Sequence, residues 1–112
     1  VWHELEKIYL PWRDYDGNEF LGQGGFWMQK QHLFMCPFYY IDYCLASVCA
    51  MQFKVMMDED FEKAWKNYYK LCNLSARDFF TNVIVEAGLN SPFEDGCMEK
   101  LVDKFEKKAF NR

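Results

Sequence analysis

Residues 38–57, FYYIDYCLASVCAMQFKVMM, decide the fold of this 112-residue chain. Proline is favoured at the first position of a helix, so Pro37 predicts a long helix that runs from there to about Met57. The clearly polar side chains within this stretch are Asp42, Ser47, Gln52 and Lys54. A helix that is apolar on almost every side must also be buried on almost every side. We therefore expect a buried central helix that other helices enclose.

A membrane span is the alternative explanation for this apolar stretch, because a spanning helix needs about 20 apolar residues. Asp42 lies well inside the run, and the neighbouring predicted helices resemble those of ordinary soluble proteins. We therefore expect no membrane partner. A charged segment followed by an apolar run and a small-residue cleavage site is also absent, so we expect no secretory signal.

The rest of the chain favours helices over strands. Residues 11–25 contain the breaker pairs DG and GG and predict turns, and residues 26–34 predict a short helical turn. Further helix signals predict a helix over residues 1–10 that stops at Pro11, one capped by Asp58, one capped by Ser75 and closed by Gly88, and a last one after Gly96. Only residues 82–85 are rich in β-branched side chains. The sequence thus predicts an all-α, multi-helix segment.

The length of the chain limits how much of the central helix it can cover. A domain of this size buries about two-thirds of its surface, with one core face for each helix. A helix that is apolar all round needs more neighbours than four short helices supply. We therefore expect the chain to be part of a larger helical body.

Composition and charge exclude several functional classes. The chain is 51% hydrophobic, which is too apolar for disorder. Its 13 basic and 17 acidic side chains leave a net charge of −4, and no basic stretch alternates with the aromatics, so we expect no nucleic-acid partner. The five cysteines are irregularly spaced and form no C-x-x-C pair. Reduced, structural cysteines in a cytoplasmic protein are the favoured interpretation, with disulfides as the alternative.

His32 and three tyrosines are the candidate binding residues. On a helix, Tyr39, Tyr40 and Tyr43 would fall within an arc of about 100°. Neutral tyrosine donates hydrogen bonds up to about pH 10, so such a group suits a surface that binds carbonyl oxygens. Structural alternatives remain open, because His32 can tie a loop to a helix and tyrosines can simply pack. Asp42 is either a buried partner or a charge that suits a helix start.

No complete metal site can be built from this sequence. His3-Glu4 begins like the zinc-protease motif H-E-x-x-H, but the residue four positions after His3 is Lys7. His3 and His32 are the only histidines in the chain, and they are far apart in the sequence.

Several stretches resemble the C-terminal end of the oligoendopeptidase F and thimet oligopeptidase family of zinc metallopeptidases. The resemblance is carried by residues 9–12 (YLPW), 24–27 (GGFW), 32–34 (HLF) and 37–43 (PFYYIDY), and it continues through residues 64–65 (AW), Tyr68, 87–89 (AGL) and 92–93 (PF). It covers nearly the whole chain. It implies that residues 1–112 are the C-terminal, substrate-binding part of a helical peptidase catalytic domain.

The resemblance also implies roles for individual residues. The zinc ligands would lie upstream, so zinc would be the cofactor of the full-length parent and this segment would bind none and be inactive alone. His32 would contact the backbone of the bound oligopeptide substrate. Tyr40 and Tyr43 would match a tyrosine pair that faces the scissile carbonyl, with Tyr43 donating to the developing oxyanion. Residues 34–37 are one residue shorter than the Gly-rich loop of thimet-type members, so Tyr39 is an alternative to Tyr40.

A second hypothesis comes from a different functional class. The chain could be a non-catalytic helical interaction module that holds a partner with its aromatic face. An H-E-x-x-H motif upstream of Val1 would favour the peptidase, and its absence would favour the module. In either case, we expect the isolated chain to expose a large apolar patch and to self-associate.

Overall fold

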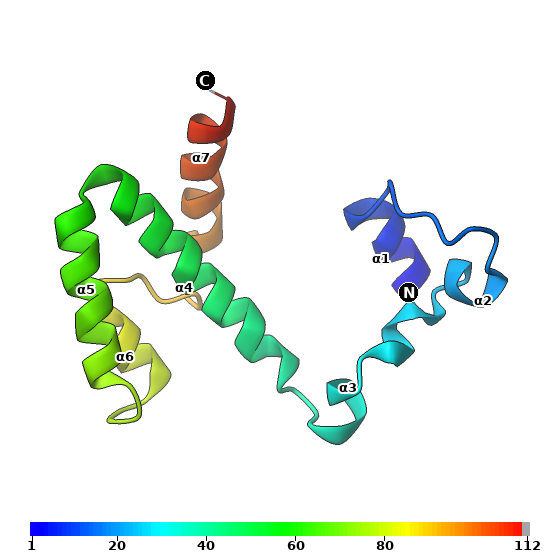
Figure 1. Cartoon of the computed structure of the whole chain (residues 1–112), viewed down its shortest axis with the longest axis horizontal. Helices are drawn as coiled ribbons and strands as arrows, with labels where there is room; N and C mark the ends of the chain where they lie inside the picture. Colours follow the sequence, from blue (N-terminus) through cyan, green and yellow to red (C-terminus); the bar gives the residue numbers. More distant parts are fainter. Residues whose placement is uncertain (111–112) are drawn as a thin grey trace. The chain divides into compact units, whose positions relative to one another are not determined.

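The computed structural model describes residues 1–110, and this part of the chain contains helices and turns only (Figure 1). The all-α prediction is therefore confirmed. In chain order, the elements are α1 (Trp2–Tyr9), α2 (Glu19–Gly22), the 3₁₀ helix η1 (Gly25–Gln29), α3 (His32–Met35), α4 (Tyr40–Glu59), α5 (Phe61–Leu74), α6 (Phe80–Glu86) and α7 (Cys97–Phe110).

The chain forms two units that we describe separately. The first unit is Val1–Tyr40, and the second begins at Ile41. None of the helices in the part of the chain that the structure describes combines the length and apolar character needed to cross a membrane.

A polar cluster holds α1 against the loop that follows it in the first unit. Tyr15 donates its hydroxyl hydrogen to the Glu6 carboxylate at 2.6 Å, and Arg13 lies 3.6 Å from the same oxygen. The Tyr15 hydrogen bond, aided by Arg13, lowers the pKa of Glu6. Burial and then the Glu6 carboxylate raise the pKa of Tyr15. Glu6 is thus a buried carboxylate whose charge Tyr15 and Arg13 stabilise.

Two adjacent glycines allow η1 to approach α1 and α2 closely. A Cβ atom at Gly24 would lie 2.9 Å from the backbone nitrogen of His3, and Gly24 has a left-handed φ of 96°. A Cβ atom at Gly25 would lie 2.5 Å from the Phe20 ring. Real Cβ atoms do not approach this closely, so side chains at either position would push η1 away.

Two cationic side chains lie over the aromatic ring of Phe26 in η1. The Arg13 guanidinium lies 4.5 Å and the Lys30 ammonium 5.1 Å from its ring centre. Tyr15 lies beside it, with 5.9 Å between ring centres. Each cation–π contact at an exposed site contributes about 0.5–1 kcal/mol. These contacts connect η1 to the loop whose Arg13 and Tyr15 side chains contact Glu6 of α1.

The core of the second unit forms along one face of α4. Cys49 and Phe53, one turn apart, pack with Ile84 of α6 and with Leu89, and Met56 and Leu71 lie against this cluster. Phe53 also meets the Tyr68 ring of α5 edge to face, with 5.6 Å between centres. The α5 helix reverses direction after α4, and α6 lies beside it (Figure 1).

Burial of α4 is only partial within this chain. The residues of α4 that are buried are Cys49, Gln52, Phe53 and Val55. Ile41 and Met51 are exposed, so the predicted enclosure on every side is not found among the described residues. The reason is the number of neighbours, because α5, α6 and α7 together cover one face of the second half of α4.

The long helix begins later than predicted. Phe38 has a φ of 69°, in the left-handed region that an α-helix cannot contain. The helix α4 therefore starts at Tyr40, and the predicted start at Pro37 is wrong.

Two of the predicted helix caps are also wrong. The α4 helix continues through Glu59, and Asp60 instead of Asp58 caps α5, accepting a hydrogen bond from the Lys63 N–H at 3.0 Å. Asp58 stays within α4 and pairs with Lys54 one turn earlier. Ser75 ends α5, and its N–H donates to Leu71.

The predicted stop of α6 at Gly88 is confirmed. Gly88 has a φ of 80°, and the next N–H, of Leu89, donates back to the carbonyl of Ile84 at 2.9 Å. A Cβ atom at Gly88 would lie 2.6 Å from the amide nitrogen of Asn67 on α5. Glycine therefore both ends α6 and leaves room for α5.

Candidate functional site

His32 and Tyr40 form the centre of the candidate site in the first unit. His32 opens α3 and is half-buried, and its imidazole stacks on the Tyr40 phenol with 4.7 Å between ring centres and 21° between ring planes. A ring pair at this separation and angle is a favourable offset stack. The stack brings together two of the residues that the sequence singled out.

A second stack fixes α3, the helix that carries His32. The ring centres of Trp27 in η1 and Phe34 in α3 lie 5.7 Å apart, with 24° between the ring planes. The backbone between them turns tightly, because the Leu33 N–H donates to Lys30 and the Met35 N–H donates to Gln31. His32 is therefore positioned by η1, which the two glycines and Phe26 hold in turn.

The three tyrosines do not share one helix face. Tyr39 lies in the turn before α4, and its N–H donates to the Cys36 carbonyl at 3.1 Å. The prediction of a common helical arc is thus wrong for Tyr39, because the left-handed Phe38 delays the helix. Tyr40 and Tyr43 are three residues apart on α4, so they lie on neighbouring positions of one side of that helix.

All three phenol side chains are exposed within this chain, and Tyr43 is 54% exposed. The backbone at Tyr43 is held in place, because Ser47 donates its hydroxyl hydrogen to the Tyr43 carbonyl at 2.7 Å. Asp42 lies exposed in the first turn of α4. Of its two predicted roles, the structure supports the charge that complements the positive end of the helix.

This arrangement can offer hydrogen bonds to a ligand. Phenol and imidazole side chains both donate to carbonyl oxygens, and an imidazole also accepts from an amide N–H. An extended peptide presents such groups at every residue. Within the first unit, the His32 imidazole and the Tyr39 and Tyr40 phenols therefore have chemistry that suits peptide groups.

The described residues do not fit a metal ion. No group of three or more His, Cys, Asp or Glu side chains among them could hold one. His32 is stacked on a phenol, a residue that is not a ligand of zinc in sites of the usual type.

Sequence reasoning missed two polar clusters. Glu6 belongs to no sequence motif. Its role is recognisable only from its hydrogen bond with Tyr15, nine residues later in the chain. Gln52 carried a signal, since it is a polar residue in an apolar helix. The Gln52 amide forms two hydrogen bonds with the backbone of Asn90. Its Nε2 donates to the Asn90 carbonyl at 3.0 Å, and its Oε1 accepts from the Asn90 N–H at 2.8 Å.

Two solved structures match the chain over nearly its whole length, each at a probability of 1.00. One, described as "PZ PEPTIDASE A with inhibitor 2", is 41% identical over 99% of this chain, with a TM-score of 0.86. The other, described as an oligoendopeptidase F, is 45% identical over 96% of this chain, with a TM-score of 0.83. No family profile and no curated protein matches the sequence.

These matches define the class of protein that the chain resembles. Its sequence and its all-α fold are similar to a segment of a peptidase, and both matching structures carry peptidase names. The resemblance to peptidases of the oligoendopeptidase F type is therefore confirmed. The chain spans 20% and 19% of the lengths of the two matching chains.

Proposed function

We propose that this chain is the substrate-binding part of the catalytic domain of a zinc oligoendopeptidase. The observation that carries the proposal is the similarity to two peptidases, at 41% and 45% identity over 99% and 96% of the chain. The substrates would be oligopeptides. The chain would correspond to the C-terminal segment of a longer parent protein, whose remainder would be its partner.

The resemblance implies a role for each candidate residue, and the chemistry of each side chain is compatible with that role. His32, held by its stack on Tyr40, would contact the peptide backbone of the substrate. Tyr40 would lie beside the scissile carbonyl, and Tyr43, three residues further along α4, would donate to the oxyanion. Negative charge develops on that oxygen as the carbonyl carbon becomes tetrahedral, so a hydrogen bond there is stronger in the transition state than in the ground state. Tyr39 remains a second substrate-contacting candidate.

The zinc ligands would come from the parent polypeptide outside this chain, because the described residues hold no group that fits the metal. Zinc, when bound, would polarise the scissile carbonyl and supply an activated water. Without those ligands, the chain alone would be inactive. The cytoplasm is the proposed location, because the irregular spacing of the five cysteines favours reduced, structural thiols.

Two observations test the proposal: the sequence upstream of Val1 and the activity of one variant. An H-E-x-x-H motif should be found in the reading frame upstream of Val1. In the full-length protein, Tyr43→Phe should lower kcat for peptide hydrolysis by about 10²–10³ and leave KM little changed, since the oxyanion forms only in the transition state.

The matched control is Tyr69→Phe, which removes the same hydroxyl from an exposed position on α5. Unchanged turnover in Tyr43→Phe would reject the oxyanion role. Equal losses in both variants would point to a general effect on the fold.

The exposed aromatic side chains favour one alternative, a non-catalytic helical interaction module. Phe38 is 91% exposed and Phe79 is 80% exposed, an unusual degree of exposure for aromatic residues. Absence of the upstream motif would support this second function.

A further inference from the structure

A mainly apolar groove with a volume of about 740 Å³ lies in the second unit. Its walls come from the first half of α4, from the start of α6 and from the connection between α6 and α7. The residues that line this α4–α6 groove are Asp42, Leu45, Ala46, residues 79–81 and Phe93. Among these described residues, Asp42 is the only charged one. The groove is therefore an apolar surface that carries a single negative charge.

Three phenylalanine rings of the α4–α6 groove are open to solvent. Phe79 is 80% exposed, Phe93 is 63% exposed and Phe80 is 40% exposed. Single exposed apolar side chains are common on protein surfaces, whereas several around one hollow mark a site of interaction. The first half of α4 adds to this surface, because Leu45 is only half-buried and Ala46 is exposed. The groove thus lacks a cover within the part of the chain that the structure describes.

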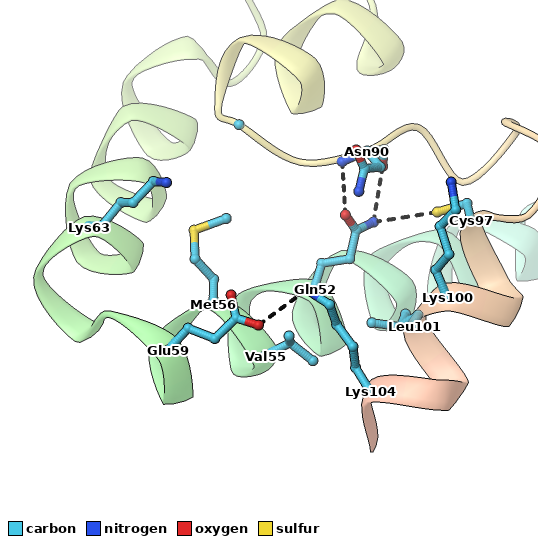
Figure 2. Close-up of a pocket in the computed structure, with 11 residues that line it drawn as sticks. Gln52, Val55, Met56, Glu59, Lys63, Asn90, Cys97, Lys100, Leu101 and Lys104 are labelled. Carbon is cyan, nitrogen blue, oxygen red and sulfur yellow. Dashed lines mark hydrogen bonds and ion pairs between the residues drawn. The ribbon is translucent and has the colours of Figure 1, made fainter. Parts of the chain in front are cut away.

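The backbone around the groove is already held in place. At the start of α6, the Asp78 carboxylate accepts a hydrogen bond from the Phe79 N–H at 2.7 Å. Gln52 of α4 forms two hydrogen bonds with the backbone of Asn90, three residues before Phe93 (Figure 2). A surface that is ordered before binding loses little conformational entropy when a partner packs on it.

The matching peptidases indicate what could cover the groove. The chain spans only 20% and 19% of their lengths, so most of a polypeptide of this type lies outside the segment that matches. The buried residues of α4 all lie in its second half, and the groove borders its first half. The described residues form no strand, so an added strand would find no sheet edge to pair with. An amphipathic helix, which packs its apolar face into a groove, is the partner that fits.

We propose that the α4–α6 groove binds an amphipathic helix of the parent polypeptide from outside residues 1–112. The apolar face of this helix would pack on Phe79, Phe80 and Phe93, and a lysine or arginine at the border of that face would pair with Asp42. Such a cover requires a longer polypeptide, so this inference rests on the proposed function.

Photo-crosslinking in the full-length protein tests this assignment. The photoreactive analogue p-benzoylphenylalanine replaces Phe79, and mass spectrometry locates the link that forms on irradiation. The link should reach one segment of the same chain outside residues 1–112, with apolar residues at helical spacing and a lysine or arginine beside them. The matched control is the same label at Tyr69, an exposed position on α5 outside the groove, which should not reach this segment.

Several results of the crosslinking would overturn the proposal. These are links from position 79 that stay within residues 1–112, links between two copies of the protein, the same link from position 69, and the absence of any link from position 79.

Hydroxyl-radical footprinting of the unmodified full-length protein is a second readout that needs no variant. Phe79 and Phe93 should be oxidised about tenfold more slowly in the folded protein than in a peptide digest of it, because the helix would exclude water from both rings. Equal oxidation rates would contradict the cover. Protection that disappears on dilution would also contradict it, since a second copy would then be the partner.

Neither readout depends on turnover, so the two proposals can fail separately. Unprotected Phe79 and Phe93 in an active peptidase would overturn the proposed cover alone. A crosslinked helix in a protein whose Tyr43→Phe variant keeps full turnover would reject the oxyanion role alone.

Discussion

At the scale of single residues, the structure connects His32 to Tyr40 through ring stacking. Offset aromatic stacks contribute about 0.5–1.5 kcal/mol beyond their buried area, so each ring restrains the other. A histidine held in this way keeps one orientation toward a ligand. Its structural role and its proposed binding role are thus compatible, and variants can separate them.

Replacing His32 tests the binding role. In the full-length protein, His32→Ala should lower kcat/KM on short peptides by about tenfold, the equivalent of one hydrogen bond to substrate. His32→Phe should show a similar loss, because it keeps the stacked ring but cannot form hydrogen bonds. Full activity in His32→Phe would show that the ring alone matters. His3→Ala is the control for loss of a histidine elsewhere in the first unit.

The Glu6–Tyr15 hydrogen bond predicts an acid-sensitive first unit. A carboxyl group whose pKa is lowered in the folded state stabilises the fold above its unfolded pKa of about 4.3, and this contribution is lost as the pH falls through the folded pKa. Tryptophan fluorescence should therefore report loosening below about pH 4.3, since Trp2, Trp12 and Trp27 lie in this unit. Glu6→Gln should flatten this acid transition, whereas Glu19→Gln, on α2, should leave it in place.

At the scale of elements, the sequence predicted which helices exist better than where they begin. Pro11 predicted the end of α1, Gly88 predicted the end of α6, and periodic apolar residues predicted α7. The start of α4 depends on the dihedral angle of Phe38, a bulky residue that rarely adopts a positive φ, so no sequence signal indicated it. For the same reason, the pairing of His32 with Tyr40 was not predictable, although both residues were identified.

The cap of α5 gives a direct test at this scale. Asp60→Ala should lower the free energy of unfolding by about 1 kcal/mol, because the Lys63 N–H loses its acceptor. Asp58→Ala should cost less, since an exposed pair with Lys54 one turn away contributes about 0.3–0.5 kcal/mol. Urea denaturation of both variants measures the difference. A larger loss for Asp58→Ala would contradict the assignment of the cap.

At the scale of the whole molecule, the chain leaves much apolar surface uncovered. Exposed aromatic and aliphatic side chains occur in both units, among them Trp12, Phe38, Ile41 and Phe79. Monomeric proteins rarely expose large apolar patches. The sequence predicted this, because a helix that is apolar all round needs more neighbours than four short helices supply.

Self-association of the isolated chain is the expected consequence. Gel filtration should show species larger than a monomer, with the proportion rising with concentration. Phe79→Ser/Phe93→Ser should reduce association, because both rings are exposed beside one apolar pocket in the second unit. A wild-type chain that elutes as a monomer at every concentration would contradict this expectation.

The Gln52 side chain has a consequence for the segment between α6 and α7. A primary amide carries a carbonyl oxygen and an NH2 group in one plane, so Gln52 can accept from the backbone N–H of Asn90 and donate to its backbone carbonyl, as an adjacent strand would. Glutamate at this position would keep the acceptor and lose the donor, and leucine would lose both. A single side chain thus satisfies two backbone groups in a connection that has no regular secondary structure.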